Sequence, residues 1–308
     1  MTKDELKSFI TAINSAKNSN ILSAYFVKKP SSVKMQSFQP QISVQVQSDI
    51  LSMIIPNILR QLDNAALVEY NPIGVADGEI EYLNKNSIEQ IDTFLDSISD
   101  EKIYKEMKAL EIPKISFYCF KIQYNEKIIY CFRQFAKMKK LRSGYIAQFF
   151  NDELKAMDGN FLGIDETVDM IYADDVAYIF NHISLERIFN YRDQYLQKTN
   201  EAMGELLRQN AIANMEQFSE DCCRDVRIMK RFTNMMTQGR LPLFFDNYEK
   251  VPEIVEELGL DIDFDDEGRI DYKEKSQLYH IVNLMSDSYF ESLLAKRRGI
   301  VKTEEALS

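Results

Sequence analysis

The sequence lacks the apolar segments that direct a chain to a membrane or hold it there. Its first twenty residues, MTKDELKSFITAINSAKNSN, have no apolar core like that of a secretory signal, and no run approaches the roughly 18 apolar residues that span a bilayer. Glycine and proline are also few, at 10 and 7 of 308 residues, while 45% of the residues are hydrophobic and 28% charged. This composition predicts a soluble, ordered, cytoplasmic protein with one large domain or two ordinary ones.

Residues that carry metal or nucleophile chemistry are scarce. Cysteines occur only at positions 119, 131, 222 and 223, where they form no CxxC pair and no cluster with His182 or His280. This spacing argues against structural zinc and against a disulfide framework. The chain also has no GxGxxG, Walker or GxSxG motif, so nucleotide hydrolysis and serine hydrolysis have no positive signal. We predict that the protein is not an enzyme and that it uses no catalytic residue, metal or cofactor.

Acidic residues are missing from two long stretches of a chain that is otherwise acidic. The formal net charge is −11, yet residues 6–48 contain five lysines and no Asp or Glu. Residues 127–151 contain six basic residues and again no Asp or Glu. These two acid-free stretches together carry +11, so the remaining residues carry −22. The acidic average therefore conceals a polarised molecule, and it does not exclude a polyanion as a partner.

The second acid-free stretch concentrates its charge in FAKMKKLRSGYIAQFF, residues 135–150. Cations near a strand end also protect a sheet edge from aggregation, but an edge usually mixes both signs of charge. A cluster of cations without acids binds a phosphate backbone favourably, because binding releases the counterions condensed on the phosphates. The neighbouring aromatic residues could stack on bases or pack in a core. The first predicted DNA-binding patch consists of Lys137, Lys139, Lys140 and Arg142.

A second cationic patch is predicted on a helix over residues 219–238 that ends at Gly239. Its arginines recur at positions i, i+3 and i+7, and each guanidinium offers a planar donor fork that suits phosphate oxygens. A solvated face that pairs with acidic residues elsewhere in the chain is the alternative. The predicted contacts are Arg224, Arg227, Lys230 and Arg231, with Lys296, Arg297 and Arg298 as a weaker third group.

The acidic segment LGLDIDFDDEGRIDYKEK, residues 258–275, supports a competing interpretation. Asp261, Asp263 and Asp265 alternate with apolar residues, so in a strand their carboxylates would share one face, as a divalent-cation site requires. The position of the glycine excludes an EF-hand loop. A β-hairpin that turns at residues 266–268 explains the same pattern. A metal-dependent nuclease that uses residues 261–271 is therefore the alternative function.

Hydrophobic periodicity predicts an α+β fold. Thr2 and Glu5 form a capping box at the start of a first helix. The predicted strands are residues 21–29, 41–47, 66–70, 79–83, 144–150, 164–172 and 176–181, with a long hairpin over 114–137 that turns at Asn125-Glu126. Further helices are predicted from Ser48 or Asp49 to Asp63, from Ser87 to Ser97, and from Ser184 onward.

These elements divide the chain into two predicted domains. Residues 1–184 form an α+β domain that has a mixed or antiparallel sheet with flanking helices and contains the basic hairpin region. Residues 185–308 form a mainly helical domain with a short β-hairpin, closely packed on the first domain.

Two stretches together resemble a known family. They are DETVDMIYADDVAYIFNHISLERIFNY, residues 165–191, and LYHIVNLMSDSYFESLLAKRRGIVK, residues 278–302. A strand pair, a turn into SLERIFNY and a closing helix with LMSDSYFESLL are similar to the KwaB family of the bacterial Kiwa anti-phage system. The resemblance covers the C-terminal half of the chain, and its motifs concern packing rather than catalysis.

The resemblance implies a cytoplasmic, DNA-binding defence effector that interferes with phage DNA replication and late expression. It implies a membrane-spanning Kiwa partner protein, which would recruit the chain to the inner membrane. The expected partners are therefore double-stranded DNA, that membrane protein and a second copy of the chain in a homodimer. A module that docks on another protein or on anionic lipid, without binding DNA, is a further alternative.

Overall fold

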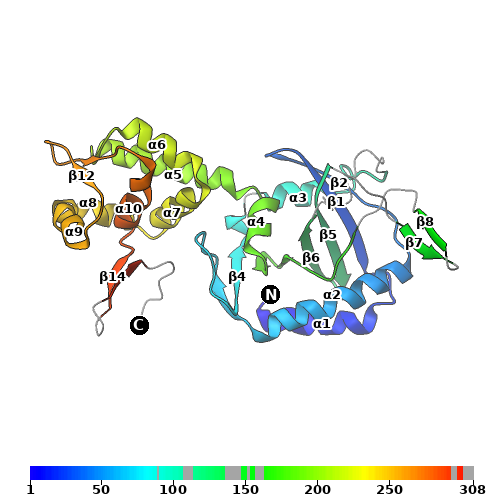
Figure 1. Cartoon of the computed structure of the whole chain (residues 1–308). Coiled ribbons are helices and arrows are strands. Elements are labelled where there is room, and N and C mark those ends of the chain that lie inside the picture. Colours follow the sequence, from blue (N-terminus) through cyan, green and yellow to red (C-terminus); the bar gives the residue numbers. More distant parts are fainter. Residues whose placement is uncertain are drawn as a thin grey trace. The chain divides into compact units, whose positions relative to one another are not determined.

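The structure is a computed structural model that describes residues 1–88, 90–106, 114–135, 147–150, 153–156, 163–292 and 297–300. It describes residues 64, 147–150 and 153–156 without their side-chain surroundings. The chain divides into two compact units (Figure 1). Unit 1 consists of Met1–Glu69 and Ala76–Asn190, and unit 2 of Tyr70–Val75 and Tyr191–Ser308.

Unit 1 is built on an eight-stranded sheet of order β2-β1-β5-β6-β9-β10-β4-β3. Its neighbouring strands pair antiparallel except for β3 and β4, which are parallel, so the predicted mixed sheet is confirmed. The strands are β1 (Leu22–Ser31), β2 (Lys34–Phe38), β3 (Ala66–Glu69), β4 (Glu79–Asn84), β5 (Ile115–Tyr124), β6 (Lys127–Gln134), β9 (Met170–Ala173) and β10 (Val176–Ile179). A separate pair is formed by β7 (Ala147–Phe150) and β8 (Glu153–Ala156).

Helices cover both faces of this sheet. On one face, α1 (Lys3–Ala16) and α2 (Val44–Asn64) lie side by side (Figure 1) and share a core with alternate residues of β1, β5 and β6. On the other face, α3 (Ile91–Ser97) places Phe94 against Phe117 and Phe132. Phe132 also meets Phe189, which follows α4 (His182–Ile188). Since both faces are buried there, the central strands β5 and β9 carry nearly continuous runs of buried residues.

Two hairpins of the sheet turn where the sequence predicts. Asn125 and Glu126 join β5 to β6, and Asp174 and Asp175 join β9 to β10. All four residues have positive φ, between 45° and 65°. Such a pair of left-handed residues is typical of the type I′ turn, whose twist matches that of the flanking strands.

The predicted strand over residues 41–47 is wrong, because these residues enter α2. The side chain of Ser43 accepts a hydrogen bond from the backbone N–H of Val46 at 3.3 Å and caps this helix. Helix α2 therefore begins before the predicted caps at Ser48 or Asp49. Val44 and Val46 alternate with polar residues yet are 48% and 45% exposed, so their alternation marks no buried strand face.

Unit 2 is mainly helical, as predicted. Its helices are α5 (Tyr191–Arg208), α6 (Met215–Arg224), α7 (Val226–Thr237), α8 (Arg240–Asp246), α9 (Val251–Leu258) and α10 (Lys275–Met285), with a 3₁₀ turn at Tyr248–Lys250. Its short strands are β11 (Ile212–Ala213), β12 (Asp263–Phe264), β13 (Ile270–Asp271), β14 (Tyr289–Glu291) and β15 (Arg298–Ile300). The predicted acidic hairpin is confirmed as β12–β13. A separate core in this unit includes Phe218, Phe232 and Ile281.

Among the described helices, none is both long enough and apolar enough to cross a bilayer.

Candidate nucleic-acid interface

The first predicted DNA-binding patch lies outside the described residues. Lys137, Lys139, Lys140 and Arg142 all fall within residues 136–146, which the structure does not describe. Their proposed contact with DNA therefore stays a prediction. The described residues that lead into this stretch are the end of β6 and Phe135.

Arg133, near the end of β6, is held by two aspartates. Its guanidinium donates to Asp165 at 2.7 and 3.1 Å and to Asp169 at 2.9 Å. The side chain of Arg133 is only 18% exposed, and that of Asp169 is fully buried. Burial alone would lower the pKa of Arg133. The hydrogen bonds and charges of the two aspartates outweigh this effect and raise the pKa above its ordinary value. Arg133 thus does not project from the sheet as a free cation.

A pocket of about 780 Å³ opens beside this arginine in unit 1. Its walls come from Lys29 of β1, residues 114–117 at the start of β5, residues 133–135 at the end of β6, and residues around α4. Among the described residues that line it, four are cationic and none is a carboxylate. The four cations are Lys29, Lys114, Arg133 and Arg187.

Lys29 ties this pocket to the end of helix α4. Its ammonium donates to the backbone carbonyls of Arg187 and Ile188 at 3.2 and 2.9 Å. These carbonyls lie at the C-terminal end of α4, where a cation is favoured by the helix dipole. Lys29 belongs to the first acid-free stretch, whereas Arg133 and Phe135 belong to the second. Strands β1 and β6 both flank β5, so the sheet brings the two acid-free stretches together at one pocket.

Helix α4 positions the opposite wall of the pocket. Asn181, not Ser184, caps this helix by accepting a hydrogen bond from the backbone N–H of Ser184 at 3.1 Å. The hydroxyl of Ser184 then donates to Gln134 at 3.3 Å and links α4 to the end of β6. Ile183 and Arg187 of the same helix also line the pocket, and both side chains are exposed.

His182, the first residue of α4, is held between two carboxylates. Its Nδ1 lies 2.7 Å from Glu81 of β4, and its Nε2 lies 2.8 Å from Glu186. Burial alone would lower the pKa of His182, but hydrogen bonds to Glu186 and Glu81 outweigh that effect and raise it to about 9. The ring is therefore cationic at neutral pH, with both nitrogens engaged, and does not suit a general base. The sequence signal for this site was the i, i+4 spacing of His182 and Glu186; nothing in the sequence pointed to Glu81.

The second predicted patch does not form one continuous ridge. The predicted helix over residues 219–238 is broken at Asp225, so Arg224 ends α6 whereas Arg227, Lys230 and Arg231 lie on α7. The break follows from the side chain of Asp225, which accepts a hydrogen bond from the backbone N–H of Arg227 at 2.9 Å and caps α7.

The cations of this patch already have partners within unit 2. Arg224 pairs with Glu220, and Arg227 pairs with Asp225 at 3.1 Å. Arg231 is half-buried, which lowers its pKa, and donates to the side-chain oxygen of Asn283 at 2.5 Å. The ammonium of Lys230 lies 5.7 Å from the ring of Tyr195. The structure thus favours a paired surface here, and contact of these residues with DNA stays a prediction.

The weaker third predicted group contains one arginine that is paired with acids and one lysine that the structure does not describe. Arg298 pairs with Glu257 and Glu291, and Lys296 lies outside the described residues.

The acidic segment proposed for metal chemistry directs its carboxylates toward its own cations. Lys273 lies 2.7 Å from Asp263 and 3.4 Å from Asp271, and Asp265 pairs with Arg269 at 2.7 Å. Across the described part of the chain, no group of three or more His, Cys, Asp or Glu side chains is placed to hold a metal ion. The hairpin accounts for the alternation of these aspartates.

A comparison with protein families identifies one match. The family model described as "Kiwa protein KwaB-like" matches residues 112–295, which is more than half of the chain. This region includes β5, β6, α4 and most of unit 2. Neither the curated proteins nor the solved structures give a match.

Proposed function

The chain belongs to the Kiwa protein KwaB-like family, which implies a role in Kiwa anti-phage defence, and we propose that it acts there as a non-enzymatic protein that binds the phosphate backbone of DNA. The proposal includes interference with phage replication and late expression. It also includes a cytoplasmic location, a homodimer, and recruitment to the inner membrane by a membrane-spanning partner. These finer points derive from the resemblance to the family.

The observation that carries the proposal is the cationic pocket of unit 1. Lys29, from one acid-free stretch, lines it together with Arg133 and Phe135 from the other. Lys29, Lys114 and Arg187 contribute positive charge to one concave surface whose described lining residues include no carboxylate, while the charge of Arg133 is balanced by Asp165 and Asp169. A phosphate-bearing polymer gains affinity at such a surface because its condensed counterions are released.

The described pocket favours backbone contact over base reading. Its cations are spread over β1, the start of β5, the end of β6 and α4, rather than along one helix that could enter a groove. Lys137, Lys139, Lys140 and Arg142 follow Phe135 closely in the sequence and extend the same acid-free stretch. We propose that they add contacts to the same backbone.

The test is a salt series of binding to duplex DNA with Lys114→Gln and Arg187→Gln combined. Both residues are exposed, so we expect the variant to fold. A matched control is Lys7→Gln with Lys105→Gln, which removes the same charge from exposed lysines of unit 1 outside the pocket. If each pocket residue contacts one phosphate, the slope of log K against log salt should shrink by about 2 in the pocket variant.

Equal affinity and equal slope in the two double variants would exclude the pocket as the DNA contact. Lys139→Gln, Lys140→Gln and Arg142→Gln together test the neighbouring stretch separately. Incubating the protein with plasmid and Mg²⁺ or Mn²⁺ in the same series tests the nuclease alternative, and we expect the DNA to stay intact.

A further inference from the structure

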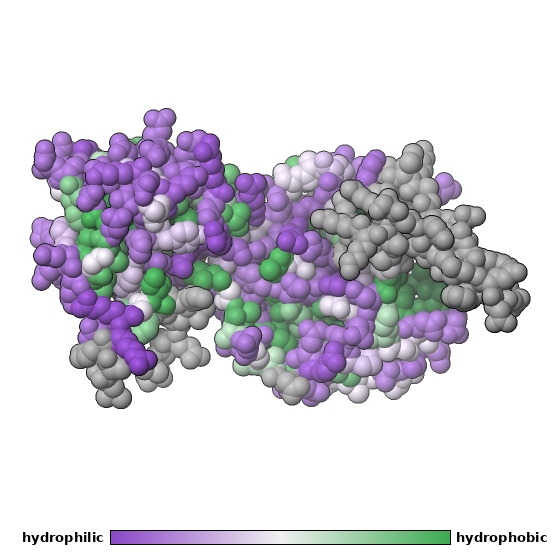
Figure 2. Space-filling model, in the orientation of Figure 1, coloured by the Kyte–Doolittle hydropathy of each residue, from purple (hydrophilic) through white to green (hydrophobic). Residues whose placement is uncertain are grey.

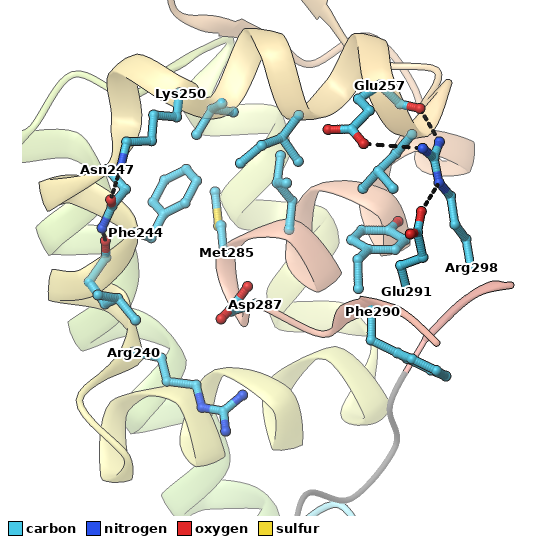
Figure 3. A pocket seen from close by; sticks show the side chains of 16 residues that line it. Arg240, Phe244, Asn247, Lys250, Glu257, Met285, Asp287, Phe290, Glu291 and Arg298 are labelled. Atoms are coloured by element: carbon cyan, nitrogen blue, oxygen red, sulfur yellow. Dashed lines mark hydrogen bonds and ion pairs between the residues drawn. The ribbon is translucent and has the colours of Figure 1, made fainter. Parts of the chain in front are cut away.

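A second pocket, of about 430 Å³, lies within unit 2 (Figure 3). Its walls are α8, the 3₁₀ turn, α9, the end of α10 and the hairpin β14–β15. The volume falls within the range of roughly 300–1,000 Å³ that is typical of small-molecule sites. Its residues do not overlap with those of the cationic pocket in unit 1.

The floor of this pocket is apolar. Phe244 and Met285 point into it from α8 and α10 (Figure 3). Val251 and Leu284 are also buried in its wall, and Ile254 is partly buried. These side chains come from three helices, so the floor belongs to the core of unit 2.

Apolar surface continues from the floor to the mouth. Leu243 and Phe290 line the pocket and are still 50% and 46% exposed. Hydrophobic residues are visible at the surface over α8 and α9 (Figure 2). Covering such surface releases about 25 cal/mol for each Å² removed from water, so an apolar occupant would be stabilised there.

The charges around the pocket balance one another. The lining includes three cations, Arg240, Lys250 and Arg298, and three carboxylates, Glu257, Asp287 and Glu291. Arg298 pairs with both Glu257 and Glu291, as Figure 3 shows. The ammonium of Lys250 donates to the side-chain oxygen of Asn247 at 3.0 Å, and Arg240 donates to the backbone carbonyl of Ser286 at 2.7 Å. Unlike those of the pocket in unit 1, the described lining residues of this site carry no excess of either charge that would select an ion.

Specific contacts hold the hairpin wall in place. Phe290 is paired with Gly299 in the β14–β15 register, and a Cβ at position 299 would meet the Phe290 ring at 2.8 Å. The absence of a side chain at Gly299 thus leaves room for the Phe290 ring against the neighbouring strand. On the adjacent residue, the Tyr289 hydroxyl lies 3.0 Å from Nδ1 of His280 in α10. The Arg298 ion pair with Glu257 links the hairpin to α9.

We propose that this pocket binds a small, uncharged, apolar molecule. The apolar floor and mouth supply the affinity, and the balanced charges around the pocket give no preference for a charged group. The concave shape and the volume of about 430 Å³ suit a small molecule. This binding is separate from the proposed contact with DNA and does not depend on it. Because the ligand would bind only the folded unit, it would also stabilise that unit in proportion to its occupancy.

The test uses the neutral fluorescent probe N-phenyl-1-naphthylamine with the full chain. We expect saturable enhancement of its fluorescence, and about tenfold or greater weakening in Leu243→Asp, because a carboxylate at the mouth must lose water when the probe binds. Leu207→Asp is the matched control, since Leu207 is a 65% exposed leucine on α5 of the same unit and does not line the pocket. Circular dichroism checks that both variants are folded.

A second variant, Phe290→Ser, should weaken the probe in the same direction. The proposal is overturned if the native chain shows no saturable binding, or if Leu243→Asp and Leu207→Asp change the affinity equally. An excess of duplex DNA should leave probe binding unchanged, and displacement of the probe by DNA would overturn the proposed independence of the two sites.

Discussion

At the scale of single residues, buried charges in unit 1 are compensated locally. His182 is cationic because Glu81 and Glu186 accept hydrogen bonds from its two ring nitrogens. The charge of Arg133 is balanced by Asp165 and Asp169, which accept hydrogen bonds from its guanidinium. An isolated charge at either position would be strongly disfavoured, since it would lose its hydration without a partner. These pairs link the first residue of α4 to β4, and the end of β6 to the segment that leads into β9.

The raised pKa of His182 predicts a specific dependence of stability on pH. The folded state binds the proton up to a pH of about 9, whereas the unfolded chain releases it near 6.5. The contribution of His182 is thus complete below about pH 6.5 and is lost as the pH rises to about 9. Urea unfolding should show a loss on the order of a few kcal/mol across this window, and His182→Gln should remove that loss.

His280→Gln is the matched control for this experiment. It changes the other histidine of the chain, so the difference in unfolding free energy between the two pH values should persist. Parallel pH profiles for the native chain and His182→Gln would contradict the assignment.

At the scale of elements, caps decide where the helices begin. Ser43 starts α2 ahead of the predicted caps, Asn181 starts α4 ahead of Ser184, and Asp225 separates α7 from α6. Each cap supplies a side-chain oxygen to a backbone N–H that has no partner inside the helix. The break at Asp225 alters the predicted second patch, because it separates Arg224 from the cations on α7.

Replacing the cap at Asp225 should destabilise unit 2. We expect Asp225→Ala to lower the free energy of unfolding by about 1 kcal/mol, since the N–H of Arg227 then loses its acceptor. Asp225→Ser keeps a capping oxygen without the charge and should lose less. Denaturant titration measures both. If Asp225→Ala were as stable as the native chain, the cap would have no energetic role.

At the scale of the whole molecule, charge is distributed unevenly over an acidic chain. The sequence of unit 1 carries 21 basic and 25 acidic residues, and that of unit 2 carries 16 and 23. Under the proposed function, the excess of negative charge should repel DNA from most of the surface and direct it to the cationic pocket, whose described lining residues include no carboxylate. The surface of α6 and α7 should contribute less, because Arg224 and Arg227 are paired with acids and Arg231 donates to Asn283.

Binding through the backbone predicts little preference for base sequence. Affinities for duplexes of unrelated sequence should agree within about tenfold, whereas a specific site would exceed other DNA by about 10³ or more. Competition between unlabelled duplexes at fixed salt measures this. Strong discrimination between them would indicate base contacts and contradict a purely backbone-directed mode.

The sequence alone determined the fold class, the long β5–β6 hairpin, the acidic hairpin and the family resemblance. These features rest on local patterns: capping residues, alternation of apolar side chains, turn residues that tolerate positive φ, and runs of charges of one sign along the chain. Tertiary structure decided which charges remain available. Lys29 and Phe135 are far apart in sequence and line the same pocket only because β1 and β6 flank β5. Arg227 and Arg133 are paired with aspartates that the periodicity of the sequence does not reveal. A charge pattern is local, but its neutralisation depends on distances that only the folded chain sets.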